Sequence, residues 1–126
     1  MSTPCRGRIV WVEIVDPQGR NPKLRPAVIV SATEAIQEGG QVWCVAVSSQ
    51  LDEAPAEEQV ELPWHRDGHP RTQLRQRCAA VCSWLVPVSL DAIRQYAGTV
   101  PGRQLNQILQ RVDPLPPLPD PTPSDS

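Results

Sequence analysis

Apolar residues recur at every second position near the start of the chain, which is the period of a β-strand. This alternation predicts a strand from Arg8 to Val15. One face would carry Ile9, Trp11, Glu13 and Val15, and the other would carry Val10, Val12 and Ile14. Because both faces are mainly apolar, we expect the strand to be buried on both sides.

Four further runs of β-branched and small apolar residues predict the rest of a sheet. They are Ala27 to Val30, Val42 to Val47, Gln59 to Leu62 and Cys78 to Val88, the last interrupted by Pro87 near its end. The stretch from Asp16 to Pro22 is dense in turn-forming residues, and we expect an exposed loop there.

The sequence predicts one short helical turn early in the chain and two helices late in it. Residues 31–34 fit a capping box, so one helical turn is expected before Gly39 and Gly40. Ser89 is the expected cap of a helix over Leu90–Tyr96. A second helix is expected over Gln104–Val112. Its apolar stripe consists of Leu105, Ile108, Leu109 and Val112.

These elements predict a mainly β (α+β) fold, a small bent barrel of five or more strands with helical additions. The 126 residues suit one domain, expected to span residues 1–112. Residues 113–126 are rich in Pro, Asp and Ser, and we expect a disordered tail because they carry little apolar surface. The Leu115–Pro119 stretch could alternatively act as a polyproline ligand.

Bulk composition narrows the function only slightly. The formal charge is −2, and the segment after Val112 contributes three Asp and no base, so the rest of the chain carries +1. This net charge is evidence neither for nor against nucleic-acid binding. No apolar run approaches the roughly 20 residues that cross a membrane, and no signal-peptide core is present, so we expect a cytoplasmic protein. Its four cysteines are then expected to be reduced.

Arg25 is the main candidate functional residue. It stands where the turn-rich loop meets the second strand, and its planar fork of donors suits a phosphate. A surface pair with Glu13 or Asp16 is the alternative. Ser48, Ser49 and Gln50 follow the third strand, where a hydroxyl can bind a phosphate oxygen, although Ser also opens turns well.

The loop from Pro63 to Arg77 is the second candidate region. An aromatic residue, two His and four Arg could stack bases and bind phosphates, whereas a solvated basic loop that balances the preceding acidic run is as plausible. A zinc site is a further alternative. Its ligands would be His65, His69, Cys78 and Cys82, although two cysteines four apart on one strand are poorly placed to share one ion.

The Arg8–Ser31 segment with its Arg25-Pro26 pair, and the Val45–Gln50 segment, resemble the MazF/PemK family of toxin ribonucleases. The resemblance covers about residues 7–112. It implies an SH3-like barrel that forms a homodimer, with the first strand and the terminal helix as candidate contact surfaces. It also implies a toxin of a bacterial type II toxin–antitoxin pair, which cleaves single-stranded RNA or mRNA without a metal or other cofactor.

The resemblance also assigns residues. Arg25 would stabilise the transition state and Ser48 would assist at the phosphate. The residues expected to bind RNA are Lys23, Ser49, Gln50, His65, Arg71, Arg75 and Arg77. The implied protein partner is a small antitoxin with a disordered acidic segment that occupies the same groove.

Two departures from the family pattern keep a rival open. Some members carry an acidic residue in the loop before Arg-Pro, where this chain has Arg20, and others an Asp on the fifth strand, where it has Ser83. His65 or His69 could serve as the base instead. The rival is a non-catalytic barrel that binds an antitoxin or RNA without cleaving.

Overall fold

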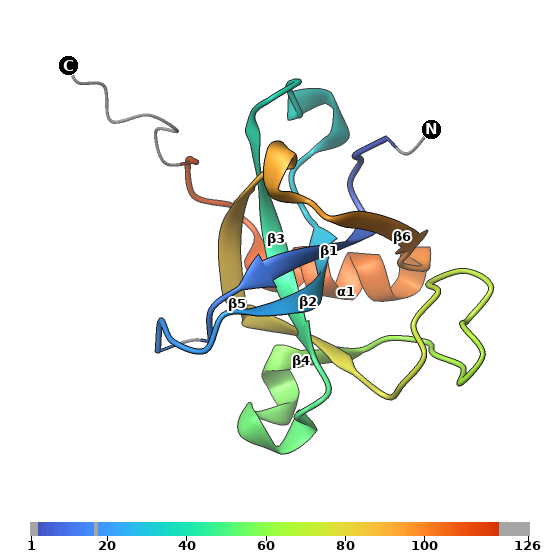
Figure 1. Cartoon of the computed structure of the whole chain (residues 1–126). Coiled ribbons are helices and arrows are strands. Elements are labelled where there is room, and N and C mark those ends of the chain that lie inside the picture. Colours follow the sequence, from blue (N-terminus) through green and yellow to red (C-terminus); the bar gives the residue numbers. More distant parts are fainter. Residues whose placement is uncertain (1–2, 17, 119–126) are drawn as a thin grey trace.

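Six antiparallel strands form one curled sheet, a half-barrel with the strand order β4-β5-β3-β2-β1-β6 (Figure 1). The structure is a computed structural model that describes residues 3–16 and 18–118. The strands are β1 (Arg8–Ile14), β2 (Lys23–Ile29), β3 (Gln41–Ser48), β4 (Gln59–Glu61), β5 (Ala79–Ser89) and β6 (Gln95–Thr99). One α-helix, α1 (Gly102–Val112), completes the fold and confirms the predicted class.

The alternation in β1 divides its side chains between two apolar cores, as predicted. Ile9 belongs to the core beneath the helix, whereas Val10 and Val12 belong to the core on the other face. The strand ends at Ile14, and Val15 is 42% exposed where the loop begins. The sequence pattern therefore set which face each residue occupies.

The second strand begins earlier than the apolar run predicted. It spans Lys23–Ile29 rather than Ala27–Val30, because Lys23 and Arg25 pair with Ile14 and Val12 of β1. Backbone pairing does not require apolar side chains, so an apolar run underestimates the strand. Arg25 is thus held inside a strand rather than at the end of a loop.

The helix expected over Leu90–Tyr96 is wrong. Ser89 does cap a turn, since its Oγ accepts a hydrogen bond from Asp91 N at 3.3 Å, but the turn is a 3-10 helix that ends at Ala92. The chain then forms β6, which pairs with β1. A seven-residue helix gains little over its nucleation cost, whereas the open edge of β1 pairs with Gln95, Tyr96 and Thr99.

The turn predicted after Ser31 also takes a different form. A 3-10 helix spans Thr33–Ala35, and its N-cap residue is Ala32, which makes no side-chain cap. Ser31 Oγ instead accepts a hydrogen bond from Trp43 N at 2.8 Å. The serine therefore joins the turn to β3 rather than capping a helix.

The terminal helix lies against β4 and β5 (Figure 1). Its predicted stripe faces the core. Ile108 is fully buried and Val112 is nearly so, while Leu105 and Leu109 pack against the same core. No helix among residues 3–16 and 18–118 is long and apolar enough to cross a membrane.

The chain continues along the barrel after the helix. Leu115 packs against the core, and Trp43 Nε1 donates a hydrogen bond to the carbonyl oxygen of Pro116 at 2.7 Å. These contacts extend beyond Val112, where the tail was expected to begin. Residues 119–126, the rest of that expected tail, lie outside the described residues.

Burial should make the core thiols unreactive. Burial raises the pKa of the Cys44 thiol to about 12 and that of Cys78 to about 11, so little thiolate forms near neutrality. We expect Cys5, which is only half-buried, to react first with iodoacetamide at about pH 8, and all four to react in denaturant. Peptide mass spectrometry measures this, and equal labelling of Cys5 and Cys44 in folded protein would contradict it.

Gly98 should tolerate no side chain. A Cβ there would lie 1.9 Å from the carbonyl oxygen of Arg71 in the neighbouring loop, so the Gly98→Ala change must displace backbone. We expect it to lower the free energy of unfolding by about 1–3 kcal/mol, measured by urea denaturation. Gly102→Ala is the matched control, since nothing lies within 4 Å of its Cβ, and it should not destabilise.

Candidate functional site

Arg25 and Ser48 lie side by side on neighbouring strands. Ala27 of β2 pairs with Ala46 of β3 at the end of their antiparallel ladder, and the same register continued by two residues places position 25 opposite position 48. Both are two residues from that pair, which places them on the same face as the two alanines. The sheet register thus brings a guanidinium and a hydroxyl together.

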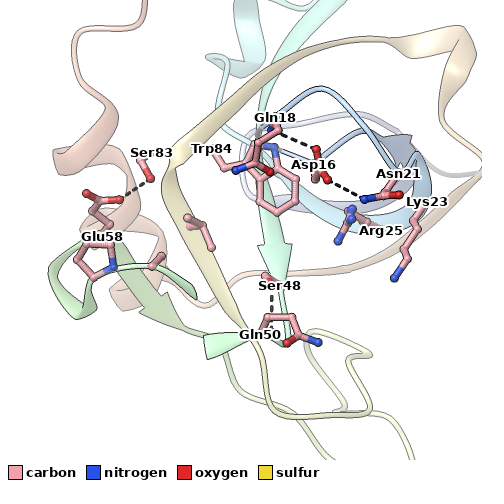
Figure 2. A pocket seen from close by; sticks show the side chains of 13 residues that line it. Asp16, Gln18, Asn21, Lys23, Arg25, Ser48, Gln50, Glu58, Ser83 and Trp84 are labelled. Carbon is pink, nitrogen blue, oxygen red and sulfur yellow. Dashed lines mark hydrogen bonds between the residues drawn. The ribbon is translucent and has the colours of Figure 1, made fainter. Parts of the chain in front are cut away.

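Two pockets adjoin this pair. The first pocket, of about 800 Å³, extends towards the β1–β2 loop and β5, and the second, of about 550 Å³, extends towards the basic loop and β6. Four residues line both pockets, namely Lys23, Arg25, Ser48 and Gln50. Figure 2 shows the first pocket with Lys23 and Arg25 on one side and Glu58 on the other. A ligand that spans both pockets would pass over Arg25 and Ser48.

Arg25 is held from two directions. Its Nε donates a hydrogen bond to the carbonyl oxygen of Ile14 at 3.3 Å, and its guanidinium lies over the Trp84 ring, 5.0 Å from the centroid. Among the described residues no carboxylate lies within 4.0 Å of it, so the alternative of a pair with Glu13 or Asp16 is wrong. An aromatic face orients an Arg without neutralising its charge, and its remaining donors can bind an anion.

Ser48 has a structural role that does not exclude a chemical one. It is 8% exposed, and its Oγ accepts a hydrogen bond from Gln50 N at 3.0 Å, which is the turn-opening role expected of Ser. The hydroxyl hydrogen and one lone pair stay available. Ser48 can therefore order the turn and donate to an anion on Arg25 at once.

Asp16 organises the loop beside the first pocket. Its Oδ1 accepts hydrogen bonds from Arg20 N at 2.8 Å and Gln18 N at 3.1 Å, and its Oδ2 accepts one from Asn21 Nδ2 at 3.0 Å. The bond from Arg20 is the main reason that the pKa of this carboxyl lies below 3.8. The loop ahead of Arg25 is thus ordered by its own side chains.

The basic loop contributes only its last residues. Arg75 lines the second pocket together with Gln73 and Gln76, whereas His65, Arg71 and Arg77 line neither pocket. Arg77 Nε instead donates to Glu61 Oε2 at 2.6 Å, and Arg71 Nε donates to Thr99 Oγ1 at 3.2 Å. Of the residues assigned from sequence, Lys23, Arg25, Ser48, Ser49, Gln50 and Arg75 gather at the site.

Neither histidine lies at the site. His69 Nδ1 accepts hydrogen bonds from Arg71 N and Thr72 N, and His65 Nδ1 accepts one from Asp67 N. The part of the chain that the structure describes contains no group of three His, Cys, Asp or Glu side chains placed to share a metal ion. The zinc alternative therefore has no assembled site, and both imidazoles order the loop.

Two features of the first pocket had no signal in the sequence. Trp84 of β5 packs against one core, and its ring also supports Arg25. Glu58, on a 3-10 turn, accepts a hydrogen bond from Ser83 Oγ at 2.5 Å (Figure 2). Glu58 thus places a carboxylate beside Ser83, the β5 position at which this chain lacks the Asp of some family members. Glu58 directly precedes β4, which pairs with β5, so this contact depends on the folded sheet.

Comparison with known proteins gives one family. Residues 5–115 match the family model described as the PemK-like, MazF-like toxin of type II toxin–antitoxin systems. No curated protein sequence matches the chain.

Solved structures share the fold at low sequence identity. MazF from Deinococcus radiodurans is 18% identical, with 89% of this chain and 94% of that one covered at a TM-score of 0.68. An endoribonuclease in complex with its cognate antitoxin, from Mycobacterial species, is 15% identical, with coverages of 87% and 91% and a TM-score of 0.66. Mycobacterium tuberculosis toxin MazF-mt6 is 12% identical, with coverages of 83% and 92% and a TM-score of 0.62.

The Asp16 hydrogen bonds give the loop a pH dependence of known sign. The folded pKa is lowered, so the carboxylate stabilises the loop fully above pH 3.8 and this is lost as the pH falls through the folded value. We expect the amide NMR signals of Gln18 and Arg20 to shift with a midpoint below pH 3.8. In Asp16→Ala both signals should lose that titration, and an unchanged midpoint in the variant would contradict the assignment.

Proposed function

This chain belongs to the PemK-like, MazF-like toxin family of type II toxin–antitoxin systems, and we propose on this premise that it is a metal-independent endoribonuclease acting on single-stranded RNA. The observation that carries the proposal is the Arg25 guanidinium, stacked on Trp84 and free of any described carboxylate, opposite Ser48 on the next strand. A cation without a carboxylate partner, beside a hydroxyl and in the groove formed by the two adjoining pockets, suits a phosphodiester.

The reaction needs only RNA and these side chains. The 2′-oxygen of the substrate bonds to the adjacent phosphorus and loses its proton, and the bond from phosphorus to the 5′-oxygen breaks as that oxygen gains one. Negative charge builds on the equatorial phosphoryl oxygens, where Arg25 donates two hydrogen bonds and Ser48 a third. The products end in a 2′,3′-cyclic phosphate and a 5′-hydroxyl.

The groove on either side would hold the RNA strand. Lys23 lies in both pockets and Arg75 in the second, so both would bind phosphates, while Ser49 and Gln50 would contact nucleotides near the scissile bond. His65, Arg71 and Arg77 lie outside the pockets and are proposed as outer contacts to a longer RNA. Cations spaced along a groove are the usual means of holding a single strand.

The same groove suits a protein inhibitor. We propose that a small antitoxin with an acidic segment places its carboxylates on Lys23, Arg25 and Arg75, where RNA phosphates would otherwise lie. One of the solved structures above is an endoribonuclease in complex with its cognate antitoxin. By analogy with the family, the toxin is proposed to act as a cytoplasmic homodimer.

A non-catalytic barrel that only binds RNA or an antitoxin is the second candidate. It is favoured by one observation, namely that the exposed β5 residue beside the first pocket is Ser83 rather than a carboxylic acid. Hydroxyls are poor proton acceptors near neutral pH. Cleavage itself separates the two candidates.

The test is cleavage of a long unstructured RNA in EDTA. We expect wild type to cut and Arg25→Ala to cut about 10²–10³-fold more slowly, the usual loss when one preorganised donor is removed from a transition state. Arg103→Ala is the matched control, because Arg103 is exposed on α1 and lines neither pocket. End analysis should find 2′,3′-cyclic phosphates.

Two results would overturn the ribonuclease. Absence of cutting by folded wild type across varied RNAs would leave the binding-only barrel as the better account. Undiminished cutting by Arg25→Ala, with circular dichroism matching wild type, would place the reaction elsewhere on the molecule.

A further inference from the structure

Four glutamines from separate places in the sequence converge on the second pocket. Gln50 follows β3, Gln73 and Gln76 end the basic loop, and Gln95 begins β6. Within the described residues, none of their side-chain amides makes a hydrogen bond to protein. Each amide offers both a donor and an acceptor, so the pocket presents a set of unengaged polar groups of mixed polarity.

The charges of the two pockets differ. The lining of the second pocket includes Lys23, Arg25 and Arg75 and no carboxylate, whereas Asp16 and Glu58 line the first pocket. A polyanion therefore meets three cations without repulsion in the second pocket only. This favours an anionic ligand, such as a nucleotide, over a neutral one.

The pocket also has an apolar surface. Trp11 and Leu24 line it, and Leu24 is 53% exposed. Trp11 pairs with Gln95 in the β1–β6 ladder, so an aromatic ring and an amide are neighbours. An aromatic surface beside hydrogen-bonding groups is how proteins commonly bind an unstacked RNA base, and about 550 Å³ is within the range of small-ligand pockets.

The loop that carries two of the amides is fixed in place. Thr72 is fully buried, donates to Pro63 O at 2.8 Å and accepts from Leu74 N at 3.1 Å. Gln73 N donates to His69 O at 2.7 Å, and Gln73 adopts a left-handed φ of 64°. Strained backbone held by this many bonds is a sign of a positioned loop rather than a mobile one.

We propose that the second pocket binds the base of a nucleotide adjoining the scissile phosphate, and that Gln76 and Gln95 determine which base it accepts. This rests on the proposed ribonuclease function and deepens it. The amides hydrogen-bond the Watson–Crick edge of the base, Trp11 contacts its face, and Arg25 and Lys23 bind the phosphates on either side. A base whose edge mismatches the amides leaves polar groups unpaired and is rejected.

The test measures binding without cleavage. Oligonucleotides of 2′-fluoro RNA lack the attacking hydroxyl, and each carries A, C, G or U at one central position in a uridine or a cytidine background. We expect full-length wild type to prefer one base by about tenfold in Kd, and Gln76→Leu/Gln95→Leu to reduce this preference to below about threefold. Fluorescence anisotropy gives both values.

Matched variants keep the result interpretable. Gln107→Leu removes an exposed amide on α1, outside both pockets, and should keep the wild-type preference. Gln76→Leu alone, at an exposed position, is the second variant should the double variant unfold, and it should lose part of the preference.

Three results would overturn the inference. The first is a wild type that binds all central bases equally, and the second is a double variant that keeps its preference. The third is a double variant that weakens every oligonucleotide equally and changes its oligomeric state in light scattering, because the pocket would then be a contact between two copies. Cleavage of all-ribose RNA is scored separately, so base selection without cutting would overturn only the ribonuclease.

Discussion

The fold depends on a sheet that buries both of its faces. Along β3, Val42, Cys44 and Ala46 enter one core while Val45 and Val47 enter the other. A strand surrounded in this way cannot slip by one residue without exchanging its two sets of side chains. The register of β2 against β3 is therefore fixed, and with it the distance between Arg25 and Ser48. The relative position of these two residues is therefore set by packing in the two cores rather than by contacts within the site.

The site is built where that double burial ends. Ala27 and Ala46 are both fully buried. Arg25 lies two residues before Ala27 on β2, and Ser48 lies two residues after Ala46 on β3. Arg25 keeps its charge available because its support is the face of Trp84 and a backbone carbonyl, neither of which neutralises it. The carboxylates nearby are occupied by other partners, Asp16 by its own loop and Glu58 by Ser83.

Sequence reasoning recovered what periodicity and local chemistry encode. The five predicted strands and the terminal helix are present, although β2 begins at Lys23 rather than Ala27 and the helix begins at Gly102. Arg25 and Ser48 line the same two pockets. The segment after Ser89 was predicted as a helix because its seven residues fit that pattern locally. Its pairing with the open edge of β1 cannot be read from the local sequence. Trp84 was missed for a similar reason. A tryptophan in an apolar strand predicts core, and only the sheet curl reveals a cation above its ring.

The pairing of β1 with β6 governs when the molecule can be assembled. Arg8 pairs with Thr99, and the core that contains Ile9 is closed by Ile108 of the terminal helix. A chain emerging from the ribosome at about 5–20 residues per second cannot form these contacts until Thr99 and Ile108 have been made. The two strands that carry Arg25 and Ser48 lack their full support throughout that time. Truncated products that end before α1 would therefore lack these supports of the site.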